Sequence, residues 1–287
     1  MKVWIDGQLV DESEAKLSVF DHCTLYGDGV FEGIRIYGGR IFRCRDHVDR
    51  FYASARKIRL ALPYSREEII EAMERTIAAN EQVDGYIRMV ATRGAGTLGL
   101  NPMICAPPSV FIIVSSIALY PPEMYEKGMG VIIAKTRRIG AASLDLSIKS
   151  CNYLNNILAK IEAIDAGLAE AVMLNEMGHV AECTADNIFI VTDGVVKTPP
   201  SADNILHGIT RQTVLELADK LGIETREESF TPEELLAADE CFLTGTAAEV
   251  IAVTSVDANP IGNGKPGPVT GRLLTAFREY VAAGDFA

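Results

Sequence analysis

The sequence predicts an α+β fold in two domains, with more strands than long helices. Strand-type alternation and helix-type spacing occur in both halves, and 287 residues suit two domains of roughly 150 residues each. Pro121 and Pro122 interrupt the middle of the chain, because a proline pair fits neither an interior strand nor a helix interior. We therefore expect a small N-terminal domain at 1–118, an interdomain linker at 119–128 and a large domain at 129–287.

Glycine turns and one helix cap organise the first domain. Asp6-Gly7 and Gly38-Gly39 each separate two short apolar runs, which is typical of β-hairpins. Ser65 lies three residues before a glutamate, a capping-box pattern that predicts a helix start. The elements expected here are a β-meander followed by a helix at 47–60, a helix from 65 to about 80, and strands at 86–92 and 110–116.

Strands and helices continue through the second domain. Gly167 is expected to end one helix, and Thr231 with Glu234 marks the start of another. The expected elements are strands at 131–136, 171–174, 187–191 and about 240–255, and helices at about 152–166, 210–221, from 231 and from 270.

Composition excludes several classes of function. The net charge of −12 disfavours nucleic acid and anionic membranes as partners, although a local pocket for small anions is compatible with it. No targeting pattern opens the sequence and no apolar run reaches the ~20 residues of a membrane helix. The six cysteines show no metal-ligand spacing, so we expect free thiols, a cytoplasmic protein and no metal.

One lysine stands out in the stretch SIKSCNYLNN (147–156). Apolar residues alternate before Lys149, and an apolar helical pattern follows it, so its surroundings look half-buried. A lysine is most often a solvated surface residue, and a buried one needs a partner or a function. Lys149 is therefore a candidate nucleophile.

Two small-residue loops and one carboxylate add to this candidate. LHGITRQTV (206–214) runs from a glycine turn into a helix, and FLTGTAAEV (242–250) is a strand broken by small residues. Both can present backbone N–H groups to a phosphate, although each pattern alone is common at ordinary turns and helix starts. Glu182 leads into an apolar strand and needs a cationic partner if it is buried. A lysine, a carboxylate and a phosphate cradle together suit pyridoxal phosphate, whose pyridine nitrogen a carboxylate keeps protonated.

Eight motifs in order make the chain resemble the class IV, fold-type IV pyridoxal-phosphate aminotransferases, and most of all the branched-chain aminotransferases. The resemblance covers nearly the whole chain and implies a small α/β N-terminal domain and a larger β-barrel-like, cofactor-binding domain with flanking helices. The motifs are YGDGVFEGIR (26–35), HVDRFYASA (47–55), DGYIR (84–88), RGAGTLGLNP (93–102), KSCNYLNNILAKIEA (149–163), AECTADNIF (181–189), LHGITR (206–211) and ADECFLTGTAAEV (238–250).

The resemblance also implies roles for single residues. Lys149 matches the Schiff-base lysine, Glu182 the partner of the pyridine nitrogen, and Tyr153 the partner of the phenolic oxygen. The phosphate would be held by Arg50, Ile209, Thr210 and Thr246, with Leu206 and Gly208 as further cofactor-binding positions. The implied substrate positions are Tyr26, Phe31, Gly33, Tyr86, Arg88, Leu98, Leu100, Thr246 and Ala247.

The activity implied is transamination of L-leucine, L-isoleucine and L-valine with 2-oxoglutarate. The resemblance further implies a homodimer or larger homo-oligomer in which the loop at 94–102 reaches the neighbouring subunit's pocket. Three alternatives stay open: a D-amino acid aminotransferase, an aminodeoxychorismate lyase of the same fold, and a cofactor-binding protein without turnover. The chain reads YIRM at 86–89 where the family often reads YIRP, and Tyr120 and Tyr125 align only loosely with the family's pocket aromatics. Both departures leave substrate breadth open.

Overall fold

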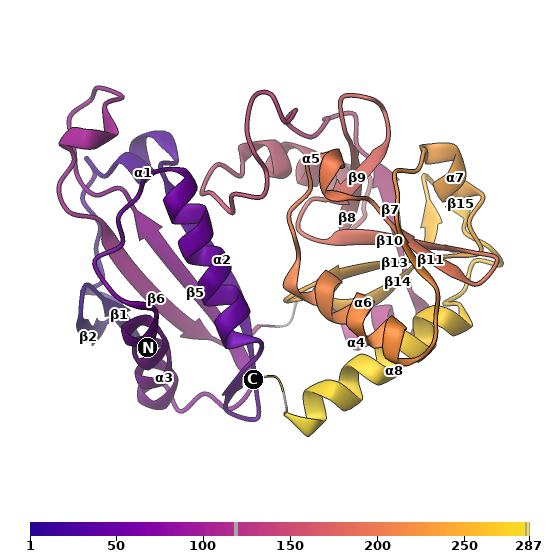
Figure 1. Ribbon diagram of the computed structural model, residues 1–287, viewed down its shortest axis with the longest axis horizontal. Coiled ribbons are helices and arrows are strands. Elements are labelled where there is room, and N and C mark those ends of the chain that lie inside the picture. Colours follow the sequence, from indigo (N-terminus) through magenta and orange to yellow (C-terminus); the bar gives the residue numbers. More distant parts are fainter. Residues whose placement is uncertain (118–119, 285, 287) are drawn as a thin grey trace. The chain divides into compact units, whose positions relative to one another are not determined.

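The computed structural model describes residues 1–117, 120–284 and 286. Their contacts divide the chain into two units, each with its own sheet (Figure 1). The predicted α+β class is confirmed. Unit 1 comprises Met1–Ile117, Ile148–Asn152 and Val281–Ala287, and unit 2 comprises Ala118–Ser147 and Tyr153–Tyr280.

Six strands form the sheet of unit 1, and all neighbouring strands are antiparallel. They are β1 (Lys2–Ile5), β2 (Gln8–Asp11), β3 (Gly29–Tyr37), β4 (Arg40–Ile41), β5 (Gly85–Thr92) and β6 (Ser109–Ser115). Both predicted hairpins, β1–β2 and β3–β4, are confirmed, and Asp6, Gly7, Gly38 and Gly39 all adopt the positive φ that tight turns need. The expected meander is wrong. The order is β2-β1-β6-β5-β3-β4, because β1 takes β6 as its second neighbour and the hairpins lie at opposite edges.

The helices of unit 1 are α1 (His22–Tyr26), α2 (Cys44–Lys57) and α3 (Arg66–Ala79), and a short 3₁₀ turn, η1, spans Pro102–Ile104. In α2, Val48, Phe51 and Ala55 are spaced three and four apart and are all buried against the sheet. α2 packs on β3, while α3 packs on β1 and β6 (Figure 1). The predicted capping box is confirmed, with reciprocal bonds between Ser65 and Glu68.

A buried ion cluster lies between α2 and β3. Glu32 on β3 has no solvent exposure and accepts hydrogen bonds from Arg50 Nε at 2.7 Å and Arg50 Nη2 at 2.8 Å. His47 Nδ1 lies 2.9 Å from the same carboxylate. Burial acts to raise the pKa of Glu32, but the charge of Arg50 and the bonds from His47 and Arg50 outweigh it and hold that pKa well below its usual range. Glu32 is therefore ionised inside the protein.

Unit 2 is built on a larger, mixed sheet of parallel and antiparallel pairs. Its strands are β7 (Met129–Ile133), β8 (Glu170–Leu174), β9 (Val180–Cys183), β10 (Asn187–Thr192), β11 (Val195–Thr198), β12 (Thr225–Glu227), β13 (Glu240–Gly245), β14 (Glu249–Val256) and β15 (Asn259–Pro260). The order is β12-β11-β10-β13-β14-β7-β8-β9, with β15 paired to β14. β7 runs parallel to both β14 and β8, and β12 runs parallel to β11.

Helices flank this sheet. They are α4 (Pro122–Lys127), α5 (Leu154–Asp165), α6 (Ile209–Lys220), α7 (Pro232–Leu236) and α8 (Pro268–Ala283), with a 3₁₀ turn, η2, at Ser201–Asp203. α5 packs on β8, α6 on β13 and α4 on β14 (Figure 1). Among the described residues, no helix combines the length and apolar character that crossing a membrane requires.

Two sequence predictions about single elements are wrong. The strand expected over 240–255 is a hairpin of β13 and β14, because the chain turns back at 246–248 and Gly245 pairs with Glu249. The β-meander expected before the helix at 47–60 is also interrupted at Tyr26, which lies in α1. Asp21 caps the start of α1 by accepting from Cys23 N, and Gly27 ends it with a left-handed φ of 71°.

The expected domain boundaries differ from the division by contacts. The boundary placed at 118–119 lies outside the described residues. The linker expected at 119–128 contains α4 and groups with unit 2, because Tyr120 and Tyr125 pack against that unit's core. The segment 148–152 and the C-terminal residues group with unit 1, although the expected boundary assigned them to the second domain.

We predict that Glu32→Gln lowers the free energy of unfolding of unit 1 by about 3–5 kcal/mol, because it leaves the Arg50 charge buried without its partner. Asp11→Asn breaks an exposed pair with Lys2 and should cost less than about 1 kcal/mol. Urea titration followed by the fluorescence of Trp4, which lies in this core, measures both.

The wild type should also lose stability as the pH falls below about 4.3, the ordinary pKa of an unfolded glutamate. A depressed folded-state pKa stabilises fully above that value, and the contribution disappears as the carboxylate is protonated. Glu32→Gln should lack this part of the acid sensitivity. A variant as stable and as acid-sensitive as the wild type would contradict the assigned role of the ion pair.

Candidate active site

Backbone pairing places Lys149 beside β3. Phe31 N donates to the Lys149 carbonyl at 2.9 Å, and Cys151 N donates to the Gly29 carbonyl at 2.9 Å. Lys149 N in turn donates to Ser54 Oγ of α2 at 3.1 Å. The lysine is half-buried, as its sequence context predicts, and its backbone is fixed by bonds to two elements.

Cationic and aromatic side chains gather around Phe31. Lys149 Nζ and the Arg88 guanidinium carbon each lie 4.7 Å from the centre of its ring. Arg88 also donates to the Tyr86 hydroxyl at 3.3 Å. Gly33 leaves the space for that hydroxyl, because a Cβ at position 33 would stand 1.7 Å from it. Four of the expected substrate positions therefore lie together with Lys149 within unit 1.

Arg50, expected to bind phosphate, lies in unit 1 and holds Glu32 with one edge of its guanidinium. A guanidinium has five N–H donors in a fixed fork, so a role toward a second anion is compatible with this pair. His47 faces the same carboxylate, and its Nε2 is buried without a hydrogen-bond partner. The expected phosphate contact of Arg50 stays a prediction.

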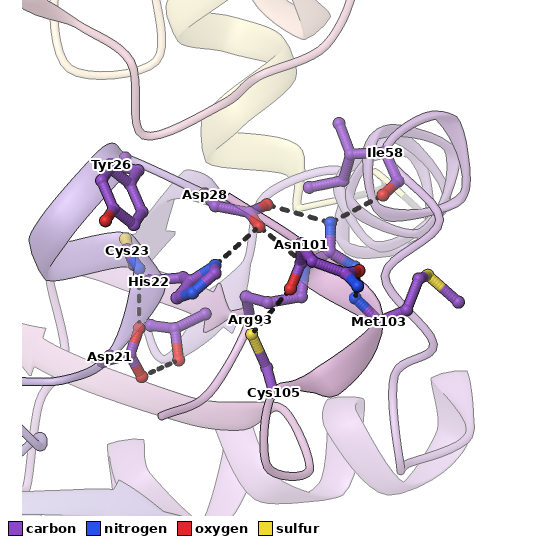
Figure 2. A network of polar contacts seen from close by, with 12 residues as sticks. Asp21, His22, Cys23, Tyr26, Asp28, Ile58, Arg93, Asn101, Met103 and Cys105 are labelled. Carbon is purple, nitrogen blue, oxygen red and sulfur yellow. Dashed lines mark hydrogen bonds and ion pairs between the residues drawn. The ribbon is translucent and has the colours of Figure 1, made fainter. Parts of the chain in front are cut away.

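The loop at 94–102 is anchored by a polar network at its base (Figure 2). Arg93 binds Asp28 through Nε at 2.8 Å and Nη2 at 2.9 Å, and also donates to the Ile58 carbonyl at 2.7 Å. Tyr26 donates its hydroxyl to the Leu98 carbonyl. Leu98 and Leu100 are 72% and 77% exposed, so a fixed loop presents two leucines to the outside.

In unit 2, Glu182 sits in a dense set of donors. It is buried on β9, and Arg138 Nη2 donates to its Oε1 at 2.6 Å. Its Oε2 accepts from Asn187 Nδ2 at 3.2 Å and from Leu206 N at 3.1 Å. The cationic partner that a buried Glu182 requires is therefore Arg138.

The same contacts tie Glu182 to the start of α6. Asn187 Nδ2 also donates to the Leu206 carbonyl at 2.9 Å, and a Cβ on Gly208 would stand 2.0 Å from Asn187 Oδ1. Gly208 is the N-cap of α6 and provides no side-chain cap, so the first N–H groups of the helix are left for another acceptor.

Thr210 strengthens the case for an anion at this helix start. Its hydroxyl is buried in the first turn of α6 and has no hydrogen-bond partner. An orphaned buried donor, uncapped N–H groups and the helix dipole together fit a phosphate group. The expected positions Leu206, Gly208, Ile209 and Thr210 are thus brought together with Glu182.

Thr246 and Ala247 form the turn between β13 and β14. Gly245 before it packs closely on Asp186, and Ala248 after it accepts from the Tyr125 hydroxyl at 3.1 Å. Tyr153 stands at the N-cap of α5. The expected residues are thus divided between the two units, and their joint action on one ligand stays a prediction.

Comparison with known proteins places these groups in a family. A model of the class IV aminotransferases matches residues 29–256. The chain belongs to this family. A putative branched-chain-amino-acid aminotransferase of Methanocaldococcus jannaschii is 47% identical, over 97% of this chain and 96% of that protein. The Escherichia coli K12 branched-chain-amino-acid aminotransferase is 37% identical, over 96% and 91%.

Solved structures of branched-chain aminotransferases have the same fold as this chain. The Escherichia coli branched-chain aminotransferase superposes with a TM-score of 0.94 at 36% identity, covering 97% of this chain and 93% of that one. A branched-chain aminotransferase of T.th. with pyridoxamine 5'-phosphate gives 0.94 at 40%, covering 98% and 94%. The resemblance inferred from the eight motifs is confirmed.

Several residues around the candidate site were not found from the sequence. Arg138, Glu32 and Asp28 each carry a buried or half-buried ion pair that supports an expected residue or loop. Glu32 and Asp28 lie inside the quoted motif 26–35, where the available signal was a carboxylate after apolar residues at Glu32 and a carboxylate between two glycines at Asp28. Arg138 had no such signal, because its partner lies 44 residues away.

We predict that Gly208→Ala lowers the melting temperature of the protein measured without added ligand. The new methyl group must displace Asn187, which bonds both Glu182 and Leu206. Gly271→Ala in α8 is the matched control, since a Cβ there meets open space and alanine favours a helix. A Gly208→Ala protein that melts with the control would show that the close packing at this helix start is not required.

Proposed function

We propose that this protein transfers the amino group between L-leucine, L-isoleucine or L-valine and 2-oxoglutarate, with pyridoxal 5'-phosphate as cofactor. The observation that carries the proposal is similarity to branched-chain aminotransferases along almost the full chain, with Lys149 and Glu182 at the motif positions. Ligands bound in solved relatives support both substrate classes, the apolar amino acids and the glutamate/2-oxoglutarate pair. The T.th. enzyme was solved with N-(5'-phosphopyridoxyl)-L-glutamate and with 4-methylvaleric acid, and the Thermoproteus uzoniensis enzyme with norvaline.

Different residues of the chain would carry out different parts of the reaction. Pyridoxal phosphate, when bound, accepts the electron pair left on the substrate when its Cα–H bond breaks. Lys149 would hold the cofactor through its amine, and as a free amine it would carry a proton to and from Cα. Glu182, held by Arg138, Asn187 and Leu206 N, would accept the hydrogen bond of the pyridine nitrogen.

Phosphate binding would fall to the start of α6, where Ile209 N, Thr210 N and the orphaned Thr210 hydroxyl supply donors. Thr246 and Arg50 would add a hydroxyl and a charged fork. Tyr153 would donate to the phenolic oxygen. These groups would anchor the cofactor and would take no part in proton transfer.

Substrate recognition must serve an apolar side chain and a carboxylate in the same place. Phe31, Gly33 and Ala247 would supply the apolar wall, and Arg88 with Tyr86 and Tyr26 the donors. Arg88 is supported by the Tyr86 hydroxyl and lies against Phe31, so a cation and an apolar ring already meet in unit 1. A methylene more or less changes selectivity by only about 10–200-fold, so all three branched-chain substrates should react at comparable rates.

Arg88→Ala should reduce the half-reaction with glutamate much more than the half-reaction with leucine. Without the guanidinium the second carboxylate of glutamate is left unpaired, a loss of about tenfold or more at roughly 1.5–3 kcal/mol for a charged hydrogen bond. Single-turnover absorbance changes of the cofactor measure each half-reaction separately. Arg45→Ala, which removes an exposed arginine, is the control and should leave both rates unchanged.

Equal losses with both substrates would mean that Arg88 serves the common α-carboxylate or the fold. The same assay with D-amino acids tests the D-specific alternative, and aminodeoxychorismate tests the lyase. A protein that binds the cofactor but shows no half-reaction with any amino acid would be a binding protein without turnover.

We further propose a homodimer or larger homo-oligomer located in the cytoplasm. Two exposed apolar surfaces support assembly. One is the anchored loop with Leu98 and Leu100, and the other is a stripe on α5. On that helix, exposed apolar residues recur at three- and four-residue spacing, a contiguous face of the kind that marks protein interfaces. The stripe consists of Leu154, Ile157, Leu158, Ile161 and Ile164. The cytoplasm is supported by six cysteines without a disulfide.

Sedimentation velocity at assay concentration should show a dimer or a larger species. Ile157→Glu combined with Ile161→Glu should shift the protein toward the monomer, since two carboxylates on each facing surface would have to be desolvated. Glu71→Gln on an exposed position of α3 is the control. A wild type that sediments as a fully active monomer would refute the assembly.

A further inference from the structure

Arg138 is a buried arginine that faces the carboxylate assigned to the cofactor. It follows β7, and its backbone N donates to the Leu174 carbonyl at 2.9 Å. Its side chain is 5% exposed, and Nη2 donates to Glu182 Oε1 at 2.6 Å. Sequence motifs did not identify this residue.

A second contact fixes the orientation of the guanidinium. Arg138 Nη1 donates to Asn156 Oδ1 at 3.0 Å, and Asn156 Nδ2 donates to the Thr184 carbonyl at 2.7 Å. Asn156 is buried on α5, so this helix and Glu182 of β9 hold the arginine between them. The fork therefore approaches Glu182 in one direction only.

Stability alone gives a weak reason for such a pair. A buried ion pair is often no more stabilising than apolar residues of the same volume, because desolvation offsets the attraction. Its specific effect is electrostatic. A cation beside a carboxylate favours the ionised form and weakens the hold of that carboxylate on any further proton.

Two further carboxylates lie close to β9. Burial, and then the carboxylates of Glu170, Asp186 and Glu182, raise the pKa of the Cys183 thiol on β9 far above its usual range. Glu170 lies at the start of β8 and Asp186 just before β10. Arg138 is paired with Glu182, and without this cation the buried carboxylate would tend to take up a proton.

We propose that Arg138 is a positioning residue for the transamination, which keeps Glu182 ionised and aimed and limits how tightly Glu182 holds the proton of the cofactor's pyridine nitrogen. The inference rests on the proposed function, because it assumes that Glu182 serves that nitrogen. Arg138 acts through Glu182 and Asn156, and no contact of its own with substrate is required.

The test uses the holoenzyme and the pH midpoint of the bound cofactor's visible absorption. Arg138→Met removes the charge at similar length and should raise the midpoint by roughly one pH unit, because protonated forms are no longer opposed by a nearby cation. It should lower kcat at least tenfold and leave the KM for leucine within about threefold. Arg138→Lys keeps the charge and should restore the midpoint, with turnover still reduced because the fork and the Asn156 bond are lost.

Arg137→Met is the matched control, since it removes an exposed arginine one residue away and should change neither quantity. A wild-type midpoint in Arg138→Met, or a midpoint that Arg138→Lys does not restore, would overturn the inference. If Arg138→Met does not bind the cofactor, the double variant Arg138→Met/Glu182→Gln, which leaves no unpaired buried charge, is compared with Glu182→Gln. Because Arg138 acts through Glu182, the two variants should have equal midpoints, and a higher midpoint in the double variant would overturn the inference.

Glu182→Gln separates this inference from the proposed function. Wild-type turnover in Glu182→Gln would refute the role of Glu182 itself, and the role of Arg138 with it. Low turnover in Glu182→Gln together with an unchanged Arg138→Met enzyme would refute only the role of Arg138. Low turnover in both, with the midpoint shift and its rescue by lysine, is the predicted result.

Discussion

Two backbone hydrogen bonds between residues 149–151 and the start of β3 determine where Lys149 stands. They join Phe31 N to the Lys149 carbonyl and Cys151 N to the Gly29 carbonyl. The chain on either side of this short segment belongs to unit 2, yet the segment itself groups with unit 1. Residues 149–151 thereby pair with the part of the β3 edge that β4 leaves uncovered. This pairing brings Lys149 Nζ beside the Phe31 ring and close enough to His47 of the buried ion cluster for their charges to interact. Everything assigned to Lys149 depends on this pairing.

Each unit also carries one buried carboxylate held by one arginine. Glu32 with Arg50 and Glu182 with Arg138 are both paired at hydrogen-bond distance, and both carboxylates accept further bonds from a neighbouring group. Compared with apolar residues of the same volume, such pairs add little net stability, although removing one partner is costly. Their specific contribution is a fixed geometry and a fixed charge, which the site of a cofactor-dependent enzyme requires. The two arginines differ in place. Arg50 projects from a helix, while Arg138 lies in the segment after β7 and is clamped by Asn156.

Local patterns predicted local features well. The hairpins at Asp6-Gly7 and Gly38-Gly39, the capping boxes at Ser65 and Thr231, and the helix start at Ile209 follow from residues a few positions apart. The position of β1 beside β6 could not be predicted this way, since the two strands lie far apart in the sequence. The small residues of FLTGTAAEV (242–250) marked the break within 240–255, but the antiparallel pairing that turns β14 back along β13, up to Gly245 and Glu249, was not predicted. Lys149, Glu182 and the phosphate-type loops could be proposed as site residues from the sequence because each disturbs its local pattern, whereas Arg138 is ordinary in sequence and distinctive only in three dimensions.

The most direct test of the account is the site of covalent attachment. Reduction of the holoenzyme with borohydride makes the bond between lysine and cofactor permanent, and peptide mass mapping then locates it. The account predicts the adduct on Lys149, within the segment that pairs with β3, and a colourless protein for Lys149→Ala after the same treatment. An adduct on any other lysine, such as Lys160 in α5, would contradict it.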